Sequence, residues 1–129
     1  MIPTVIVDTN VIVRFLLAND PKLSPQAKAI IASAQTGKFK IYLDEVIIAE
    51  TIWVLSSYYK LDKAGIIEKL TQFINPKWVV SPRKKLLLSV LHLYATTNLH
   101  FIDAWLAQIS RSLHFPLKTF DRALQKLAS

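Results

Sequence analysis

Short apolar runs alternate along the chain with longer stretches in which apolar positions recur every three or four residues. The short runs are rich in strand-forming residues, and the longer stretches have the period of a helix with one buried face. The pattern predicts strands over residues 4–7, 40–43, 78–80 and 117–120. It predicts helices over residues 9–18, 24–36, 44–59, 62–74, 81–98, 101–113 and 122–127. Strands separated by helices pair in parallel, so we expect an α/β fold: a three-layer α/β/α sandwich with a central parallel sheet, in a single domain over residues 1–129.

Two of the predicted helices begin with a serine followed by a proline. Ser24 precedes Pro25, and Ser81 precedes Pro82. Serine is a favoured N-cap and proline a favoured first helical residue, so we expect Ser24 and Ser81 to cap these helices. Gly37 follows the first of them and is expected to end it, because glycine readily adopts the left-handed conformation.

The composition limits the classes of protein to which the chain can belong. Its 129 residues are 52% hydrophobic and 19% charged, which is typical of a folded domain rather than a disordered segment. There is no cysteine, which excludes disulfides, thiolate metal sites and a cysteine nucleophile. The two glycines, Gly37 and Gly65, are too few for the glycine-rich loops that bind nucleotide phosphates. No stretch has the pattern of a secretory signal or a membrane span, so we expect a cytoplasmic protein.

The chain carries a net charge of +7, from 16 Lys and Arg against 9 Asp and Glu. Basic residues that neutralise phosphates release bound counterions, so this charge favours a polyanionic partner. The basic side chains are scattered, apart from the run Arg83, Lys84 and Lys85, and scattered basic residues usually belong to a solvated surface. The charge therefore indicates a class of partner without naming it.

Four of the acidic residues lie next to apolar sequence. Asp8 ends the first predicted strand and Asp121 follows the last, and parallel strands present their carboxyl ends at the edge where ligands bind. Glu50 has only apolar residues three and four positions away on its helix, and Asp103 has one polar neighbour at these spacings, His100. We expect all four carboxylates in surroundings that do not suit a solvated charge.

A carboxylate that is removed from water must pair with a base, take up a proton or bind a metal ion. If the fold gathers the four acids at one edge, a divalent ion relieves their repulsion, and an all-oxygen ligand set suits Mg²⁺ or Mn²⁺. Such a site supports phosphodiester hydrolysis, because divalent ions lower the pKa of water and stabilise the leaving oxygen.

Each acid also has a purely structural interpretation. Asp8 and Asp121 can be N-caps of the helices that follow them, a role that does not exclude ligation. Glu50 can pair with a distant base, and Asp103 can be stabilised by the dipole in the first turn of its helix. Four such coincidences are less probable than one shared site.

Four motifs in order along the chain resemble those of one family. They are VIVDTNVI at residues 5–12, IAETIWVL at 48–55, FIDA at 101–104 and LKTFDR at 117–122. Together they resemble the acidic motifs of the PIN-domain ribonucleases, in particular the VapC-type toxins of prokaryotic toxin–antitoxin pairs. The resemblance covers nearly the whole chain, although residues 62–88 carry no recognisable motif.

The resemblance implies a metal-dependent endoribonuclease that acts on RNA, forms a homodimer and is bound by an antitoxin protein. It implies that one or two Mg²⁺ or Mn²⁺ ions are held by the four acids, and that two polar residues support the site. These residues are Asp8, Glu50, Asp103 and Asp121, with Asn10 and Thr119 in the supporting role. The basic residues that we expect to contact RNA phosphates or the antitoxin are Arg14, Lys118 and Arg122.

Three other classes of protein also place an aspartate after a strand. A haloacid-dehalogenase-like phosphatase needs a second aspartate two residues after its nucleophile, and the chain has Asn10 there. A receiver-like signalling module carries its aspartate after a middle strand, whereas Asp8 follows the first. A PIN-like module that binds RNA or protein without cleaving it stays open, although the presence of all four acids favours an enzyme.

Overall fold

The computed structural model describes residues 1–128, which fold into two compact units. The first unit is Met1–Pro82, and the second begins at Arg83 and includes the described residues up to Ala128. Each unit is described by itself below. Among the described helices, none combines the length and apolar character that a membrane crossing requires.

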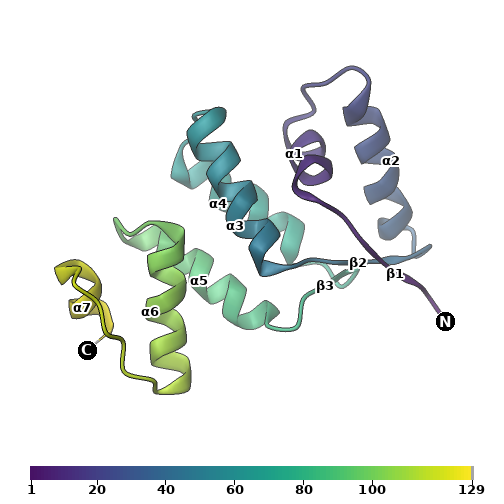
Figure 1. Cartoon of the computed structure of the whole chain (residues 1–129). Helices are drawn as coiled ribbons and strands as arrows, with labels where there is room; N and C mark the ends of the chain where they lie inside the picture. Colours follow the sequence, from purple (N-terminus) through teal and green to yellow (C-terminus); the bar gives the residue numbers. More distant parts are fainter. Residues whose placement is uncertain (129) are drawn as a thin grey trace. The chain divides into compact units, whose positions relative to one another are not determined.

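The first unit is an α/β structure built on a parallel sheet (Figure 1). Its elements are β1 (Thr4–Ile6), α1 (Thr9–Leu17), α2 (Leu23–Gln35), β2 (Lys40–Tyr42), α3 (Glu45–Trp53), the π-helix η1 (Val54–Tyr58), α4 (Lys63–Ile74) and β3 (Val79–Val80). The sheet order is β1-β2-β3, and both neighbouring pairs are parallel. In the register, Ile41 of the central strand lies opposite both Val5 and Val79. The three strands and four helices predicted for this part of the chain are confirmed.

Local sequence explains where these helices begin and end. The Asp44 side chain accepts a hydrogen bond from the Val46 amide at the start of α3, and Asp62 accepts one from the Gly65 amide at the start of α4. Gly37 has a φ of 87° just after α2, and its amide donates to the Ala34 carbonyl, so it ends this helix as predicted.

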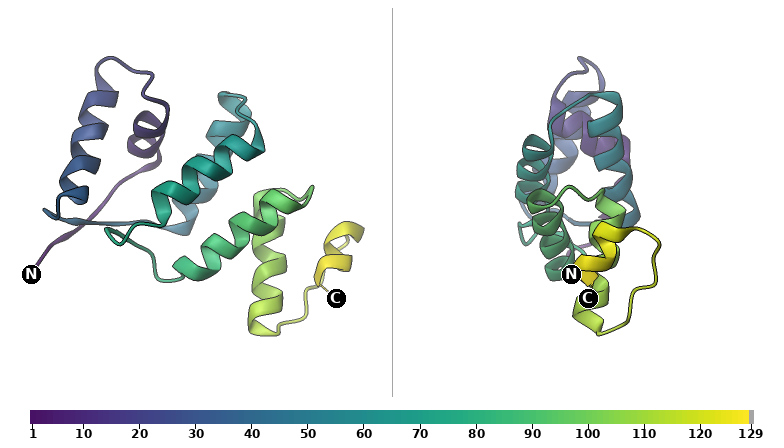
Figure 2. Two further views of the ribbon diagram at one scale, coloured as in Figure 1. Left: turned by 180° about the vertical axis from the view of Figure 1, so that it is seen from behind. Right: turned by 90° about the vertical axis from the view of Figure 1, so that its left-hand side faces the viewer.

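The core of the first unit lies between the sheet and its helices. Its fully buried apolar side chains include Ile12, Ile31, Ile41, Leu43, Ile48, Leu55, Ile66, Leu70 and Ile74. The helix α1 packs against both α2 and α3, and Figure 2 shows the α1–α2 pair from behind. The positions of α1 and α3 are therefore set by the same core that orders the sheet.

The predicted N-cap of α2 is wrong. The helix begins at Leu23, and the Oγ of Ser24 donates instead to the Arg14 carbonyl and accepts from the Asp20 amide. The free amides at this helix end are satisfied by Asp20, whose Oδ1 accepts from Lys22 N at 2.9 Å and from Leu23 N at 2.6 Å. The hydroxyl of Ser24 therefore forms a tertiary hydrogen bond with α1, which the residues next to Ser24 in the sequence could not predict.

The carboxylate of Asp20 should make stability depend on pH. The hydrogen bonds from the Leu23 and Lys22 amides hold the pKa of Asp20 below its ordinary value of 3.8. A lowered folded pKa stabilises the protein fully above about pH 3.8, and the contribution is lost as the pH falls through the folded pKa. We expect Asp20→Ala to lower the Tm by a few degrees at pH 7, with a difference from the wild type that shrinks below pH 3.8. Glu68→Ala removes the same charge from an exposed site on α4 and should show a smaller, pH-independent change; equal behaviour of the two variants would contradict the assignment.

The second unit is a set of three helices, α5 (Lys84–Thr96), α6 (Phe101–Leu113) and α7 (Arg122–Ala128). The helix α6 packs against both of the others (Figure 1). The rings of Tyr94 and Phe101 meet edge to face at 5.9 Å, and Arg111 Nε donates to the Leu127 carbonyl at 2.9 Å. The predicted boundaries of α6 are confirmed at both ends.

Two predictions for the second half of the chain are wrong. Ser81 does not cap α5, which begins at Lys84 after Arg83. Residues 117–120 do not form a strand in the part of the chain that the structure describes. The polar groups of Thr119 are occupied locally, because its carbonyl accepts from Gln125 Nε2 at 2.5 Å and its hydroxyl accepts from Asp121 N at 3.1 Å. The segment thus serves as the lead into α7, where side-chain hydrogen bonds replace a strand ladder.

Candidate active site

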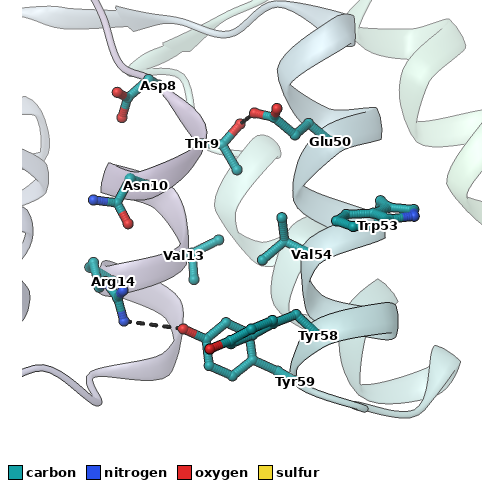
Figure 3. A pocket seen from close by; sticks show the side chains of 10 residues that line it. All are labelled: Asp8, Thr9, Asn10, Val13, Arg14, Glu50, Trp53, Val54, Tyr58 and Tyr59. Carbon is teal, nitrogen blue, oxygen red and sulfur yellow. Dashed lines mark hydrogen bonds between the residues drawn. The ribbon is translucent and has the colours of Figure 1, made fainter.

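A pocket of about 460 Å³ opens between α1 and the segment formed by α3 and η1, entirely within the first unit (Figure 3). The residues that line it are Asp8, Thr9, Asn10, Val13, Arg14, Glu50, Trp53, Val54, Tyr58 and Tyr59. Two of the four predicted acids, Asp8 and Glu50, therefore lie on one pocket although they are far apart in sequence. The predicted supporting residue Asn10 and the predicted basic residue Arg14 line the same pocket.

Asp8 occupies the point where β1 ends and α1 begins. Its extended backbone, with φ −95° and ψ 177°, makes it the N-cap of α1, and its Oδ1 accepts a hydrogen bond from Val11 N at 3.1 Å. The capping interpretation of Asp8 is thus confirmed. Its second oxygen has no hydrogen-bond partner within residues 1–128, and in Figure 3 the Asp8 carboxylate points away from Glu50.

Glu50 is held in place from α1. The hydroxyl of Thr9 donates a hydrogen bond to Glu50 Oε1, and the buried position of Thr9 keeps this donor away from water. The sequence pattern did not single out Thr9, although it stands between Asp8 and Asn10 in the first motif. The contact links the first two acidic motifs directly, so the orientation of the Glu50 carboxylate depends on α1.

Arg14 brings a positive charge to the opposite end of the pocket. Its Nη1 donates to Asn19 Oδ1 and to the Tyr59 hydroxyl, each at 3.2 Å. Both acceptors are neutral, and no carboxylate in the described chain forms an ion pair with Arg14. The Nε of Arg14 is buried without a hydrogen-bond partner among the described residues. The guanidinium is therefore held by neutral acceptors and forms no salt bridge within residues 1–128, although its charge also helps to lower the pKa of Asp20; its donors can still bind an anion.

The other two predicted acids lie in the second unit. Asp103 is half-buried in the first turn of α6, where the helix dipole favours its charge. Asp121 caps α7, since its Oδ1 accepts from Leu124 N at 2.9 Å, and Thr119 contacts the Asp121 amide. The structural interpretations of Asp103 and Asp121 are thus both supported. Lys118 and Arg122 are exposed on either side of Asp121.

The expectation that all four acids avoid water is wrong for three of them. Asp8, Glu50 and Asp121 are exposed, and only Asp103 is half-buried. For Glu50 the reason lies in its helical neighbours, because Val46 and Trp53 are themselves 73% and 63% exposed. Apolar neighbours on a helix thus do not prove that their face is buried.

The oxygen donors on the pocket suit a hard divalent ion. Asp8 and Glu50 offer carboxylate oxygens, and the residues that line the pocket include no histidine or thiol, so the donor set fits Mg²⁺ or Mn²⁺ better than zinc. Neither unit by itself, within residues 1–128, brings three His, Asp or Glu side chains together at a spacing that suits a metal ion. The first unit therefore offers two carboxylates on this pocket, fewer than a metal site of three acidic or histidine ligands requires.

The fold and the pocket define an α/β protein with one carboxylate, Asp8, after the first strand of a parallel sheet and a second, Glu50, on a helix that lines the same pocket. The family described as PIN domain matches residues 5–129, so the chain belongs to the PIN domain family. The match confirms the predicted fold class, the three-layer α/β/α sandwich, and excludes the phosphatase and receiver alternatives. PIN domains are generally nucleases and typically bind divalent metal ions. No curated protein and no solved structure matches the chain.

Proposed function

We propose that this PIN domain is a metal-dependent endoribonuclease that hydrolyses RNA phosphodiester bonds with Mg²⁺ or Mn²⁺, and that residues 1–129 act as one domain. The observation that carries the proposal is the pocket of the first unit, which holds two carboxylates at one end and, at the other, a guanidinium that forms no salt bridge within residues 1–128. This arrangement offers ligands for a divalent ion beside a cation for a phosphate. The net charge of +7 draws a polyanion toward it.

We propose Asp8 and Glu50 as metal ligands because they line the pocket, and Asp103 and Asp121 as metal ligands on the basis of the motifs alone. When bound, a divalent ion lowers the pKa of water and stabilises charge on the phosphate. Thr9 orients Glu50 through its hydroxyl, so the carboxylate is set before substrate binds.

The polar and basic residues of the motifs have supporting roles in this proposal. Asn10 supports the site from the same turn as Asp8, and Thr119 does so beside Asp121. Arg14 binds a phosphate within the pocket, because its guanidinium is held there by the neutral acceptors Asn19 and Tyr59. Lys118 and Arg122 add positive charge next to Asp121 and contact the RNA backbone.

We also propose that the protein is the toxin of a VapBC-type pair, acts in the cytoplasm as a homodimer and is inhibited by an antitoxin protein. The similarity of the four motifs to VapC-type toxins supports this role. Exposed apolar side chains on α3 and η1, namely Val46, Trp53 and Tyr58, supply a surface that a protein partner can cover.

The purified protein should cleave RNA only with a divalent ion. We expect cleavage of a mixed single-stranded RNA in Mg²⁺ or Mn²⁺, complete loss of cleavage on addition of EDTA, and recovery when excess Mg²⁺ is restored. Denaturing gel electrophoresis of the products measures the effect. The double variant Asp8→Asn/Glu50→Gln, purified in parallel, controls for a contaminating nuclease. Cleavage that persists in EDTA or in the double variant contradicts the proposal.

A further inference from the structure

The pocket of the first unit has a second end that the acidic motifs do not explain. Figure 3 shows Asp8, Thr9 and Glu50 at one end and Arg14, Tyr58 and Tyr59 at the other. Val13 and Val54 lie between the two ends. One end thus offers carboxylate oxygens, while the other offers aromatic rings beside a guanidinium.

Tyr58 exposes most of its ring at this second end. Its side chain is 73% exposed. The centroids of the Tyr58 and Tyr59 rings are 4.8 Å apart, and the ring planes form an angle of 75°. The edge-to-face contact supports the ring from one side only. An exposed tyrosine by itself is common on protein surfaces, so its meaning depends on how it is held and on what lies next to it.

The local backbone and α1 together fix the two tyrosines. Tyr58 is the last residue of the π-helix η1 and Tyr59 is its C-cap, whose amide donates to the Val54 carbonyl at 3.1 Å. The buried side chain of Leu55 anchors this turn in the core. The hydroxyl of Tyr59 accepts a hydrogen bond from Arg14 Nη1 at 3.2 Å. Single π-helical turns occur frequently at functional sites. The Tyr58 ring is thus held in place by a neighbour that is itself fixed from another helix.

Aromatic rings and guanidinium groups side by side suit a nucleotide. Unpaired bases stack on tyrosine rings, and guanidinium groups bind phosphates. The pocket volume of about 460 Å³ lies within the range of small-ligand sites, roughly 300–1,000 Å³. A base within a duplex is stacked on its neighbours and presents no free face to such a ring.

We propose that Tyr58 is a stacking platform for one unpaired nucleobase, in the nucleotide next to the phosphate that faces Asp8 and Glu50. Arg14 binds the phosphate of that nucleotide. Tyr59 is a positioning residue, because it contacts Tyr58 through its ring and Arg14 through its hydroxyl. The inference rests on the proposed function in one respect, the choice of RNA as the ligand.

Binding without cleavage tests this subsite. The full chain, in EDTA, is titrated into a short fluorescein-labelled single-stranded RNA of mixed sequence, and the Kd is read from fluorescence anisotropy. Tyr58→Ala should weaken binding between about fivefold and a hundredfold, which corresponds to the loss of one base–aromatic stack. Tyr58→Phe keeps the ring and should bind within about twofold of the wild type. Val46→Ala truncates a side chain of equal exposure on α3 outside the pocket and should have no effect.

An abasic scan of the same RNA identifies the base that stacks. One abasic position should weaken binding of the wild type but not of Tyr58→Ala, because the variant has already lost that contact. Equal Kd values for the wild type and Tyr58→Ala, or additive losses at every abasic position, overturn the subsite. If the preparation cleaves RNA in Mg²⁺ and Tyr58→Ala changes neither Kd nor KM, the proposed nuclease function stands and only the subsite is overturned.

If RNA binding depends on Tyr58 but the protein does not cleave RNA, the subsite stands and the proposed nuclease function is overturned.

Discussion

Replacing Asp8 with asparagine should lower metal-dependent RNA cleavage by at least about a hundredfold while leaving the stability of the fold nearly unchanged. Asparagine is as good an N-cap as aspartate, so the amide can still accept the hydrogen bond from Val11 N that begins α1. It lacks the negative charge that a divalent ion needs. Initial rates of RNA cleavage and thermal melts of the same preparations separate the two roles of Asp8.

Two other acids of the first unit, Glu50 and Glu68, provide the comparison. Glu50→Gln should also lose at least about a hundredfold in activity, since the amide keeps a hydrogen-bond acceptor for Thr9 but no charge. Glu68→Gln removes one charge from an exposed position on α4 that lines no described pocket, and its activity should stay within about twofold of the wild type. A Tm loss without an activity loss in Asp8→Asn would show that the capping role is the whole role of this aspartate.

Truncation of Ile41 should cost about 2–5 kcal/mol in the free energy of unfolding, the usual range for removing a large buried aliphatic side chain. Ile41 is fully buried in the central strand, between β1 and β3, and its amide donates to the Trp78 carbonyl at 2.8 Å. Ile41→Ala therefore leaves a cavity where both neighbouring strands meet the core. Urea denaturation of the variant and the wild type measures the change.

Ile6→Ala is the matched control for this cavity. Ile6 lies in the neighbouring strand β1, but its side chain is 76% exposed, so the same truncation should change the free energy of unfolding by less than about 0.5 kcal/mol. Equal losses at the two positions would contradict the burial that distinguishes them. Because α1 and α3 pack on the same core, Ile41→Ala is also expected to weaken the pocket that these helices form.

Most elements of the fold could be predicted because their signals are local. The periodicity of apolar residues predicted the helix over residues 101–113, and the aspartates at 44 and 62 marked helix starts that need only a side chain and the next few amides. The start of α2 and the strand at 117–120 could not be predicted in this way. Ser24 is taken by a contact with Arg14, and Thr119 by Gln125, so the outcome depended on partners that no local pattern names.

The sequence predicted the charged residues of the candidate site but not the uncharged side chains that contact them. Asp8, Glu50 and Arg14 were expected at the site and line one pocket of the first unit. Thr9 and Tyr59 were not expected, because their roles arise from hydrogen bonds between α1 and the α3–η1 segment. Tyr58 was not expected, because its role depends on the Tyr59 ring that this packing fixes. The exposure of Glu50 was also missed, since helical spacing reports which residues share a face but not whether that face meets water.

The sequence by itself determined the α/β class, most element boundaries and the residues that carry charge, because these depend on periodicity, capping and residue type. Only the tertiary structure decided that the Thr9 hydroxyl holds Glu50, that Arg14 reaches Tyr59 and that an open pocket joins them. The physical reason is that each of these contacts joins side chains more than forty positions apart. Such distances are closed by core packing, to which every buried residue contributes and which no single motif encodes.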